Sequence, residues 1–164
     1  MSIRLEKLTE QDGQSLFAFE KQNRSFFETM VPSRGDEYYI YENFERGLKA
    51  LVEEQLEGTS LFYLIKDESN LILGRMNVVD IEKEDQSGSI GYRIGEAFLK
   101  KGIASKALAI LLHEAKEHKI KQLYAKTTIE NVGSQKVLEK NGFLQIGKVD
   151  SNGITFIQYE LSSN

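Results

Sequence analysis

The stretch that decides the fold lies past the middle of the chain, at residues 91–107, and reads GYRIGEAFLKKGIASKA. It predicts a strand ending near Ile94, a short basic turn, and a helix that starts at Gly102. The first amides of a helix have no partner within it and carry partial positive charge. Gly102 and Ala104 leave this backbone open to close approach, and positive charge gathers beside it on Lys100, Lys101 and Lys106. The stretch is therefore a candidate pyrophosphate site, although a plain turn with solvated lysines accounts for these residues equally well.

A second stretch, residues 131–143, reads NVGSQKVLEKNGF and follows a predicted strand. Asn131 suits a helix N-cap, and Ser134 lies about one turn later, on the same face of the helix. Asn141 and Gly142 suit the end of that helix. A capped amphipathic helix accounts for each of these residues. It does not account for the occurrence of both stretches, at this spacing, in one chain.

The hydrophobic pattern places strands and helices around these two stretches. Alternating or continuous apolar runs predict strands at residues 3–6, 60–65, 71–79, 89–94, 122–127, 143–149 and 154–161. Helical spacing predicts helices after Thr9 and over residues 36–56, 102–118 and 131–140. Short loops join the strands from 60 to 94 into an antiparallel meander, and residues 150–153 predict a hairpin. The result is a mixed α/β or α+β fold, with a central, mostly antiparallel sheet flanked by helices.

Composition excludes several classes of protein. The 164 residues fit one domain, 1–164, and contain no Cys, so disulfides, thiol nucleophiles and Cys-ligated zinc are excluded. The net charge of −4 argues against a general nucleic-acid or anionic-membrane surface. No apolar run approaches the roughly 18 residues of a membrane span, and residues 1–4 lead into a charged segment rather than a signal peptide. We therefore expect a cytoplasmic protein.

Common catalytic and metal-binding motifs are missing from the sequence. It contains no phosphate-binding loop of the G-x-x-x-x-G-K-[ST] type, no G-x-G-x-x-G and no G-x-S-x-G. His113 and His118 lie in a helical segment, but residues five apart on a helix point about 140° apart and cannot share one metal ion. We therefore predict no metal site.

Together the two stretches resemble the GNAT superfamily of acetyl-CoA-dependent N-acetyltransferases. The family's pyrophosphate pattern falls on residues 99–104, and its later Asn-x-x-Ser and V-L-E-K-x-G-F patterns fall on residues 131–143. Residues 90–94, IGYRI, look like the family's splayed central strand, and residues 4–12 look like the opening of its RimJ/RimL branch, which acetylates protein N-termini. The resemblance spans essentially the whole chain, is more specific in the C-terminal half, and implies the GNAT fold.

The resemblance implies roles for individual residues. The pyrophosphate of acetyl-CoA would lie on the backbone of the turn and the helix start, formed by Leu99, Lys100, Lys101, Gly102, Ile103, Ala104 and Ser105. The strand formed by Tyr92, Arg93 and Ile94 would pair with the pantetheine arm, and the Ile94 amide would stabilise the oxyanion. Asn131 would hydrogen-bond the cofactor arm, and Ser134 would donate a proton to the leaving thiolate. Because the chain lacks Cys, transfer would be direct, without an acetyl-cysteine intermediate.

Four positions depart from the family pattern. Leu99 stands where many relatives have Gln or Arg, although the RimJ/RimL branch often has an apolar residue there. Ser89 replaces the glutamate that often serves as general base, and Thr155 and Phe156 replace an Asp-His pair, with Tyr159 retained. The base is therefore unassigned. Three acids elsewhere are further candidates that the sequence does not place: Glu20, Glu28 and Glu37.

The acceptor is a primary amine. At pH 7 deprotonation costs about 4.6 kcal/mol for a lysine and about 1–1.4 kcal/mol for an α-amine. A chain without an obvious strand base therefore favours the N-terminal α-amine of a protein. The resemblance implies that this protein could be a ribosomal protein, and it makes Tyr38 and Tyr39 candidate acceptor contacts. The acidic chain also fits a cationic acceptor. The alternatives are an acetyltransferase for a small amine (a polyamine, amino sugar or aminoglycoside) and a non-catalytic CoA-binding module. The sequence leaves monomer and homodimer equally open.

Overall fold

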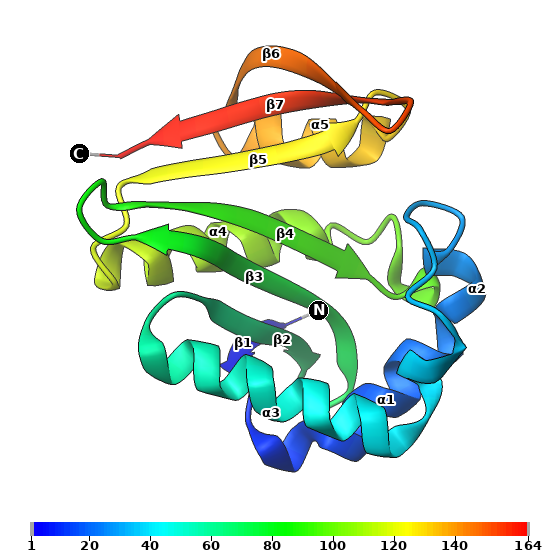
Figure 1. The fold of residues 1–164 in the computed structure, drawn as a ribbon. Coiled ribbons are helices and arrows are strands. Elements are labelled where there is room, and N and C mark those ends of the chain that lie inside the picture. Colours follow the sequence, from blue (N-terminus) through cyan, green and yellow to red (C-terminus); the bar gives the residue numbers. More distant parts are fainter. Residues whose placement is uncertain (1, 164) are drawn as a thin grey trace.

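The computed structural model describes residues 2–163, whose seven strands form one sheet (Figure 1). The strand order is β1-β2-β3-β4-β5-β7-β6, and every neighbouring pair is antiparallel except β4 and β5, which are parallel. The strands are β1 (Ile3–Lys7), β2 (Leu61–Asp67), β3 (Ile72–Glu82), β4 (Ser87–Ile94), β5 (Gln122–Thr128), β6 (Leu144–Ser151) and β7 (Ile154–Ser162). The predicted fold class and the antiparallel meander are confirmed.

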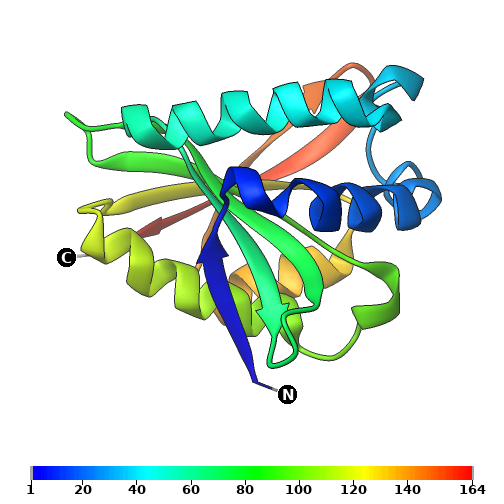
Figure 2. The ribbon, with the colours of Figure 1, turned by 90° about the horizontal axis from the view of Figure 1, so that it is seen from below.

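Helices cover both faces of the sheet, α1 and α3 on one and α4 and α5 on the other (Figure 2). The α-helices are α1 (Gly13–Gln22), α2 (Arg24–Phe27), α3 (Tyr41–Glu57), α4 (Ile103–Glu117) and α5 (Val132–Lys140). Short 3₁₀ turns lie at η1 (Glu10–Asp12), η2 (Asp36–Tyr39) and η3 (Glu96–Phe98). None of the helices in residues 2–163 combines the length and apolar character that a membrane crossing requires.

The N-terminal half differs from the sequence prediction in two places. Thr9 and Asp12 do form a capping box, with the Thr9 amide donating to Asp12 Oδ2 over 2.8 Å, but they cap a 3₁₀ turn that leads into α1. The helix predicted over 36–56 begins only at Tyr41, because Ile40 adopts an extended conformation and separates η2 from α3. Gly58, in the left-handed region at φ 83°, ends α3 as predicted.

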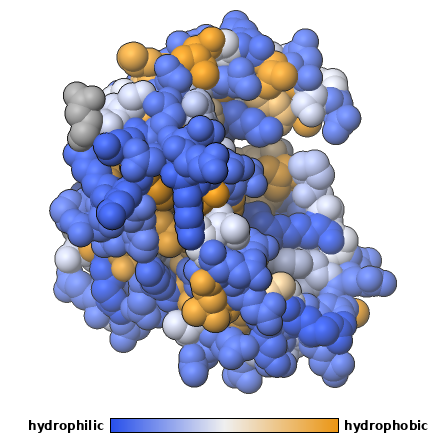
Figure 3. All heavy atoms as spheres, turned by 60° about the vertical axis from the view of Figure 1, so that its left-hand side comes forward, coloured by the Kyte–Doolittle hydropathy of each residue, from blue (hydrophilic) through white to orange (hydrophobic). Residues whose placement is uncertain are grey.

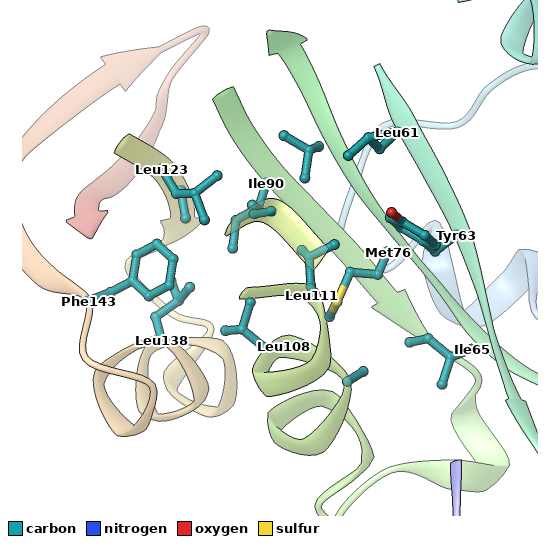
Figure 4. Close-up of a cluster of buried hydrophobic side chains, with 14 of the residues drawn as sticks. Leu61, Tyr63, Ile65, Met76, Ile90, Leu108, Leu111, Leu123, Leu138 and Phe143 are labelled. Atoms are coloured by element: carbon teal, nitrogen blue, oxygen red, sulfur yellow. The ribbon is translucent and has the colours of Figure 1, made fainter. Parts of the chain in front are cut away.

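The larger hydrophobic core lies between the sheet and the α4 and α5 layer. Residues from β2, β3, β4 and both helices meet there, as Figure 4 shows for Met76, Ile90, Leu108, Leu138 and Phe143. Tyr63, also in this core, is only 3% exposed, and its hydroxyl has no hydrogen-bond partner in residues 2–163. Burial raises the pKa of Tyr63 to about 12.

Replacement of Tyr63 by phenylalanine is expected to raise the free energy of unfolding by about 1 kcal/mol, because a buried hydroxyl without a partner carries a desolvation penalty. The folded-state pKa lies above the unfolded value of about 10, so the hydroxyl's contribution is constant below pH 10 and falls as the pH rises toward 12. Above pH 10 the difference in the free energy of unfolding between the variant and wild type therefore increases further in favour of the variant. Urea unfolding at pH 8 and pH 11 measures both effects, with the exposed Tyr124→Phe as control. A destabilised Tyr63→Phe would contradict this.

Candidate functional site

Strands β4 and β5 separate after a short paired region. Their parallel pairing covers only Ser87–Ser89 of β4, opposite Gln122–Tyr124 of β5. Beyond it β5 stays paired with β7 and β4 stays paired with β3, so the two strands diverge (Figure 1). The surface is hollowed between the part of the molecule that carries β5 to β7 and the rest (Figure 3). This is the splayed central strand that the resemblance implied.

The open side of β4 presents backbone groups at alternate residues. The amide of Gly95 donates to the Leu73 carbonyl on β3 over 2.8 Å, and Arg93 lies opposite Arg75 in the same ladder. Because the amides of a strand alternate in direction, the N–H and C=O groups of Tyr92 and Ile94 point away from β3, toward the gap. A pantetheine arm lying in the gap can therefore pair with β4 as an added strand does.

Helix α4 begins at the end of the same strand with an open N-terminus. Its N-cap, Gly102, adopts φ 75°, and a Cβ built there would meet no heavy atom within 4 Å. No side chain in residues 2–163 caps this helix, and its first turn holds no acid. Lys100 and Lys101 are exposed beside it, and Ile103 is buried where α4 enters the core. The start of α4 therefore has no side-chain cap, has two lysines beside it, and has free space in front of its amides. These properties fit a pyrophosphate.

A pair of hydroxyl groups bridges β4 and α5. The Tyr92 hydroxyl and Ser134 Oγ lie 2.7 Å apart, within hydrogen-bond distance. Ser134 is held in place by Asn131, the N-cap of α5, whose side-chain carbonyl accepts from the Ser134 amide over 3.1 Å. The predicted N-cap is thus confirmed. The sequence indicated Ser134 and Tyr92 separately but did not predict their contact.

The electrostatic setting keeps the Tyr92 hydroxyl protonated. Burial raises its pKa above the ordinary tyrosine value, and the hydrogen bond with Ser134 opposes that shift only in part. At neutral pH the pair therefore carries two hydroxyl protons, one on each side chain, and no negative charge. Such a pair is suited to give a proton to a leaving group in the gap.

A second contact, which the sequence did not indicate, joins the two helices of this face. Asn141 at the end of α5 donates from Nδ2 to Ser105 Oγ in the first turn of α4 over 3.2 Å. The same nitrogen donates to the Val137 carbonyl over 2.9 Å, which fixes the orientation of the side chain. The start of α4 and the hydroxyl pair are therefore held in one framework. In the sequence, Asn141 was assigned only to the helix end.

The remaining predicted site residues lie in two other places. Leu99 is partly exposed, at 39%, in the turn before α4. Tyr38 and Tyr39 lie half-buried in η2 with their rings 4.9 Å apart, on the side of the sheet covered by α1 and α3. Burial raises the pKa of both phenols. Tyr38 also packs its ring edge-on against Phe44, so part of its surface belongs to the hydrophobic core. The resemblance assigned Tyr38 only to contact with the acceptor.

The structure places the three acids that the sequence left open as bases. Glu20 is fully buried, and its Oε1 already lies within 3.5 Å of Tyr38 and three arginines. Glu28 accepts from Arg24 over 2.9 Å and from Ser33 over 2.8 Å, which lower its pKa. Glu37 is exposed in η2. None of these carboxylates borders the Tyr92–Ser134 pair, so the base is still unassigned.

Comparison with known proteins gives one family and close structural counterparts. The family model described as acetyltransferase (GNAT) domain matches residues 2–144. Among curated proteins, the probable N-acetyltransferase YjcK of Bacillus subtilis (strain 168) is 28% identical over 148 residues, which are 86% of this chain and 80% of that protein.

Two solved structures resemble this one over nearly its full length. The ribosomal-protein-S5-alanine acetyltransferase of Vibrio fischeri has a TM-score of 0.93 at 18% identity, covering 100% of this chain and 94% of that one. RimL, a ribosomal L7/L12 α-N-protein acetyltransferase solved with coenzyme A, has a TM-score of 0.89 at 22% identity, covering 99% and 95%. At these identities the likeness establishes the fold.

Proposed function

We propose that this chain, which belongs to the acetyltransferase (GNAT) domain family, transfers the acetyl group of acetyl-CoA directly to the N-terminal α-amine of a protein. The observation that carries the proposal is the Tyr92–Ser134 hydroxyl pair between β4 and α5, whose oxygens lie 2.7 Å apart. The structural counterparts in Vibrio fischeri and RimL are named for acetylation of ribosomal proteins, which supports a ribosomal protein as the acceptor.

The donor is held from both ends of the gap. The backbone amides at residues 101–105 bind the pyrophosphate, helped by the partial positive charge of the α4 N-terminus. The open groups of Tyr92 and Ile94 pair with the pantetheine arm, and the Ile94 N–H stabilises the negative charge that develops on the acetyl oxygen. Asn131 uses its carbonyl oxygen as the cap of α5, which leaves its amide nitrogen to meet the cofactor arm.

The transfer step uses the hydroxyl pair as the acid. The neutral amine attacks the thioester carbon, a C–N bond forms, and the C–S bond breaks with its electron pair left on sulfur. Ser134 gives its proton to this thiolate, Tyr92 restores the proton on Ser134 through their hydrogen bond, and Tyr92 regains a proton from water. The proton lost by the amine passes to water. Most of the acceleration comes from holding donor and acceptor together.

An α-amine suits a site without a base beside the hydroxyl pair. Its deprotonation at pH 7 costs about 1–1.4 kcal/mol, against about 4.6 kcal/mol for a lysine side chain. The difference of more than 3 kcal/mol corresponds to more than a hundredfold in the fraction of reactive amine. The site therefore selects α-amines by their availability as well as by contact.

Thiol release from acetyl-CoA across a panel of amines tests the proposal. The panel holds peptides with free N-termini, the same peptides with blocked N-termini, polyamines, amino sugars and aminoglycosides. Release only with the free N-terminal peptides is the expected result. Release only with small amines would replace the proposal with small-amine acetylation, and CoA binding without release would make the chain a non-catalytic CoA-binding module.

A further inference from the structure

Three arginine side chains converge on one buried carboxylate. The Nη1 atoms of Arg34, Arg75 and Arg93 lie 3.4, 3.5 and 3.4 Å from Glu20 Oε1, and the Tyr38 hydroxyl donates to the same oxygen over 3.2 Å. We call the three arginines with Glu20 the arginine cluster. Glu20 balances one positive charge of three, so the cluster carries a surplus of two in a chain whose net charge is −4.

This arrangement disfavours the folded sheet itself. Arg75 and Arg93 lie directly opposite each other on β3 and β4, and like charges at such positions are destabilising. Aromatic rings hold two of the guanidinium groups in addition to the shared Glu20 carboxylate: Arg93 lies 4.7 Å over the ring of Phe27, and Arg34 lies 4.8 Å over the ring of Tyr38. The guanidinium groups are thus fixed in position, and Glu20 neutralises only one of their three positive charges.

The cluster also holds unused hydrogen-bonding capacity. Arg75 Nη1 is buried and, apart from its 3.5 Å ion pair with Glu20 Oε1, has no hydrogen-bond partner within residues 2–163; Glu20 Oε2 is likewise buried without a partner. Buried guanidinium N–H groups normally have acceptors. Arg75 and Arg34 line a cavity of about 220 Å³, together with Tyr38, Asn43 and apolar side chains of α1 and α3. An acceptor atom supplied by a ligand would complete the cluster.

The cluster lies just across β4 from the hydroxyl pair. Tyr92 and Arg93 are consecutive in the strand, so their side chains point to opposite faces of the sheet. Tyr92 meets Ser134 of α5, and Arg93 meets Glu20 of α1. The helices α5 and α1 lie on opposite faces of the sheet (Figure 2). An amine that reaches the thioester from the α1 and α3 face therefore passes beside the arginines.

We propose that the arginine cluster binds an oxyanion of the acceptor, so that the preferred acceptor is a peptide with a carboxylate or phosphate within its first few residues. The proposal rests on the proposed function, because it assigns a specificity site for the same reaction. Guanidinium groups suit carboxylate and phosphate alike, since both accept two parallel N–H bonds. The net charge of the chain pointed to a cationic acceptor; the charge beside β4 points to an anionic one.

The experiment compares matched peptides with a free N-terminal alanine or serine. Positions 2, 3 and 4 carry Asp, its neutral counterpart Asn, or phosphoserine, one at a time. Calorimetry on the protein saturated with CoA gives Kd for each peptide, and thiol release gives kcat and KM. Three variants are compared with wild type: Arg75→Gln, Arg34→Gln and the control Arg46→Gln, an exposed α3 residue outside the cluster. Arg34 lies in a loop, so its loss leaves the core intact.

The expected result is at least tenfold tighter binding and lower KM for an Asp or phosphoserine peptide than for its Asn counterpart. Arg34→Gln and Arg75→Gln lose that preference, and Arg46→Gln keeps it. A stronger response to Asp than to phosphoserine, or the reverse, identifies carboxylate or phosphate as the natural group. Equal Kd values for Asp, Asn and phosphoserine peptides would overturn the inference even if all are acetylated. Charge-dependent binding without turnover would support the cluster and reject the proposed function.

Discussion

Ser134→Ala is expected to lower kcat about a hundredfold while the Kd of acetyl-CoA changes less than threefold. General-acid catalysis contributes about 10²–10⁴ in rate. In the variant, the Tyr92 hydroxyl remains 2.7 Å from the position that Ser134 Oγ occupied, so we expect the loss in kcat to lie at the lower end of this range. Tyr92→Phe removes the hydroxyl that returns a proton to Ser134 and is expected to lower kcat about tenfold. Steady-state kinetics and calorimetry measure the two quantities separately.

The two hydroxyl variants are expected to be non-additive, because the groups act as one unit. The double variant should therefore resemble Ser134→Ala rather than the product of the two effects. Ser151→Ala, an exposed serine on β6, is the matched control and keeps wild-type kcat. Unchanged turnover in Ser134→Ala would reject its role as the acid, and a large rise in Kd with unchanged kcat would make it a binding residue.

Gly102→Ala is expected to weaken acetyl-CoA binding at least tenfold. Gly102 adopts φ 75°, and the space in front of its Cα, where an added methyl group would point, holds no protein atom within 4 Å. The methyl group would therefore obstruct the approach of a pyrophosphate to the α4 amides. The same substitution also strains a left-handed backbone by roughly 1–2 kcal/mol, which lowers the free energy of unfolding.

Gly153 separates these two effects. It adopts φ 79° in the β6–β7 hairpin and also has no neighbour within 4 Å of an added Cβ. Gly153→Ala should show the same loss in thermal unfolding temperature as Gly102→Ala but bind acetyl-CoA as wild type does. Equal affinity for acetyl-CoA in the two variants would place the pyrophosphate elsewhere.

The sheet and most helices follow from local sequence pattern. Strands β2, β3 and β4 are continuous apolar or alternating runs joined by short turns, and Asn152–Gly153 supplies the two left-handed residues of a tight hairpin turn. The helix predicted over 36–56 was wrong at its start. The helical spacing behind that prediction begins at Tyr41, where α3 begins, and it does not cover residues 36–40 or the extended Ile40 that separates η2 from α3.

The site was predictable only in parts. The open helix start at Gly102 and the cap at Asn131 are local features, and their residue types indicated them. The contact between Tyr92 and Ser134 joins residues 42 apart and depends on how α5 packs against β4. The arginine cluster draws on a helix, a loop and two strands. Its one signal was a charged residue inside each of two mostly apolar strands, Arg75 and Arg93.

The net charge and the local charge on the α1 and α3 face lead to different predictions for the acceptor. An excess of acidic residues over the whole chain is compatible with a locally positive field, because salt at physiological concentration largely screens the interaction between exposed charges more than about 8–10 Å apart. Around Glu20 the arginines outnumber the acid within 3.5 Å. The proposal of an anionic acceptor therefore rests on the local charge next to β4 rather than on composition.

The central claim, direct acetylation of a protein α-amine, is tested most directly by one mass-spectrometric measurement. A peptide with a free N-terminus and an internal lysine is incubated with the protein and acetyl-CoA, and the fragments locate the acetyl group. We predict a single acetyl group on the α-amine and an unmodified lysine. Acetylation of the lysine in preference to the N-terminus, or no acetylation of any peptide while CoA binds, would contradict the account.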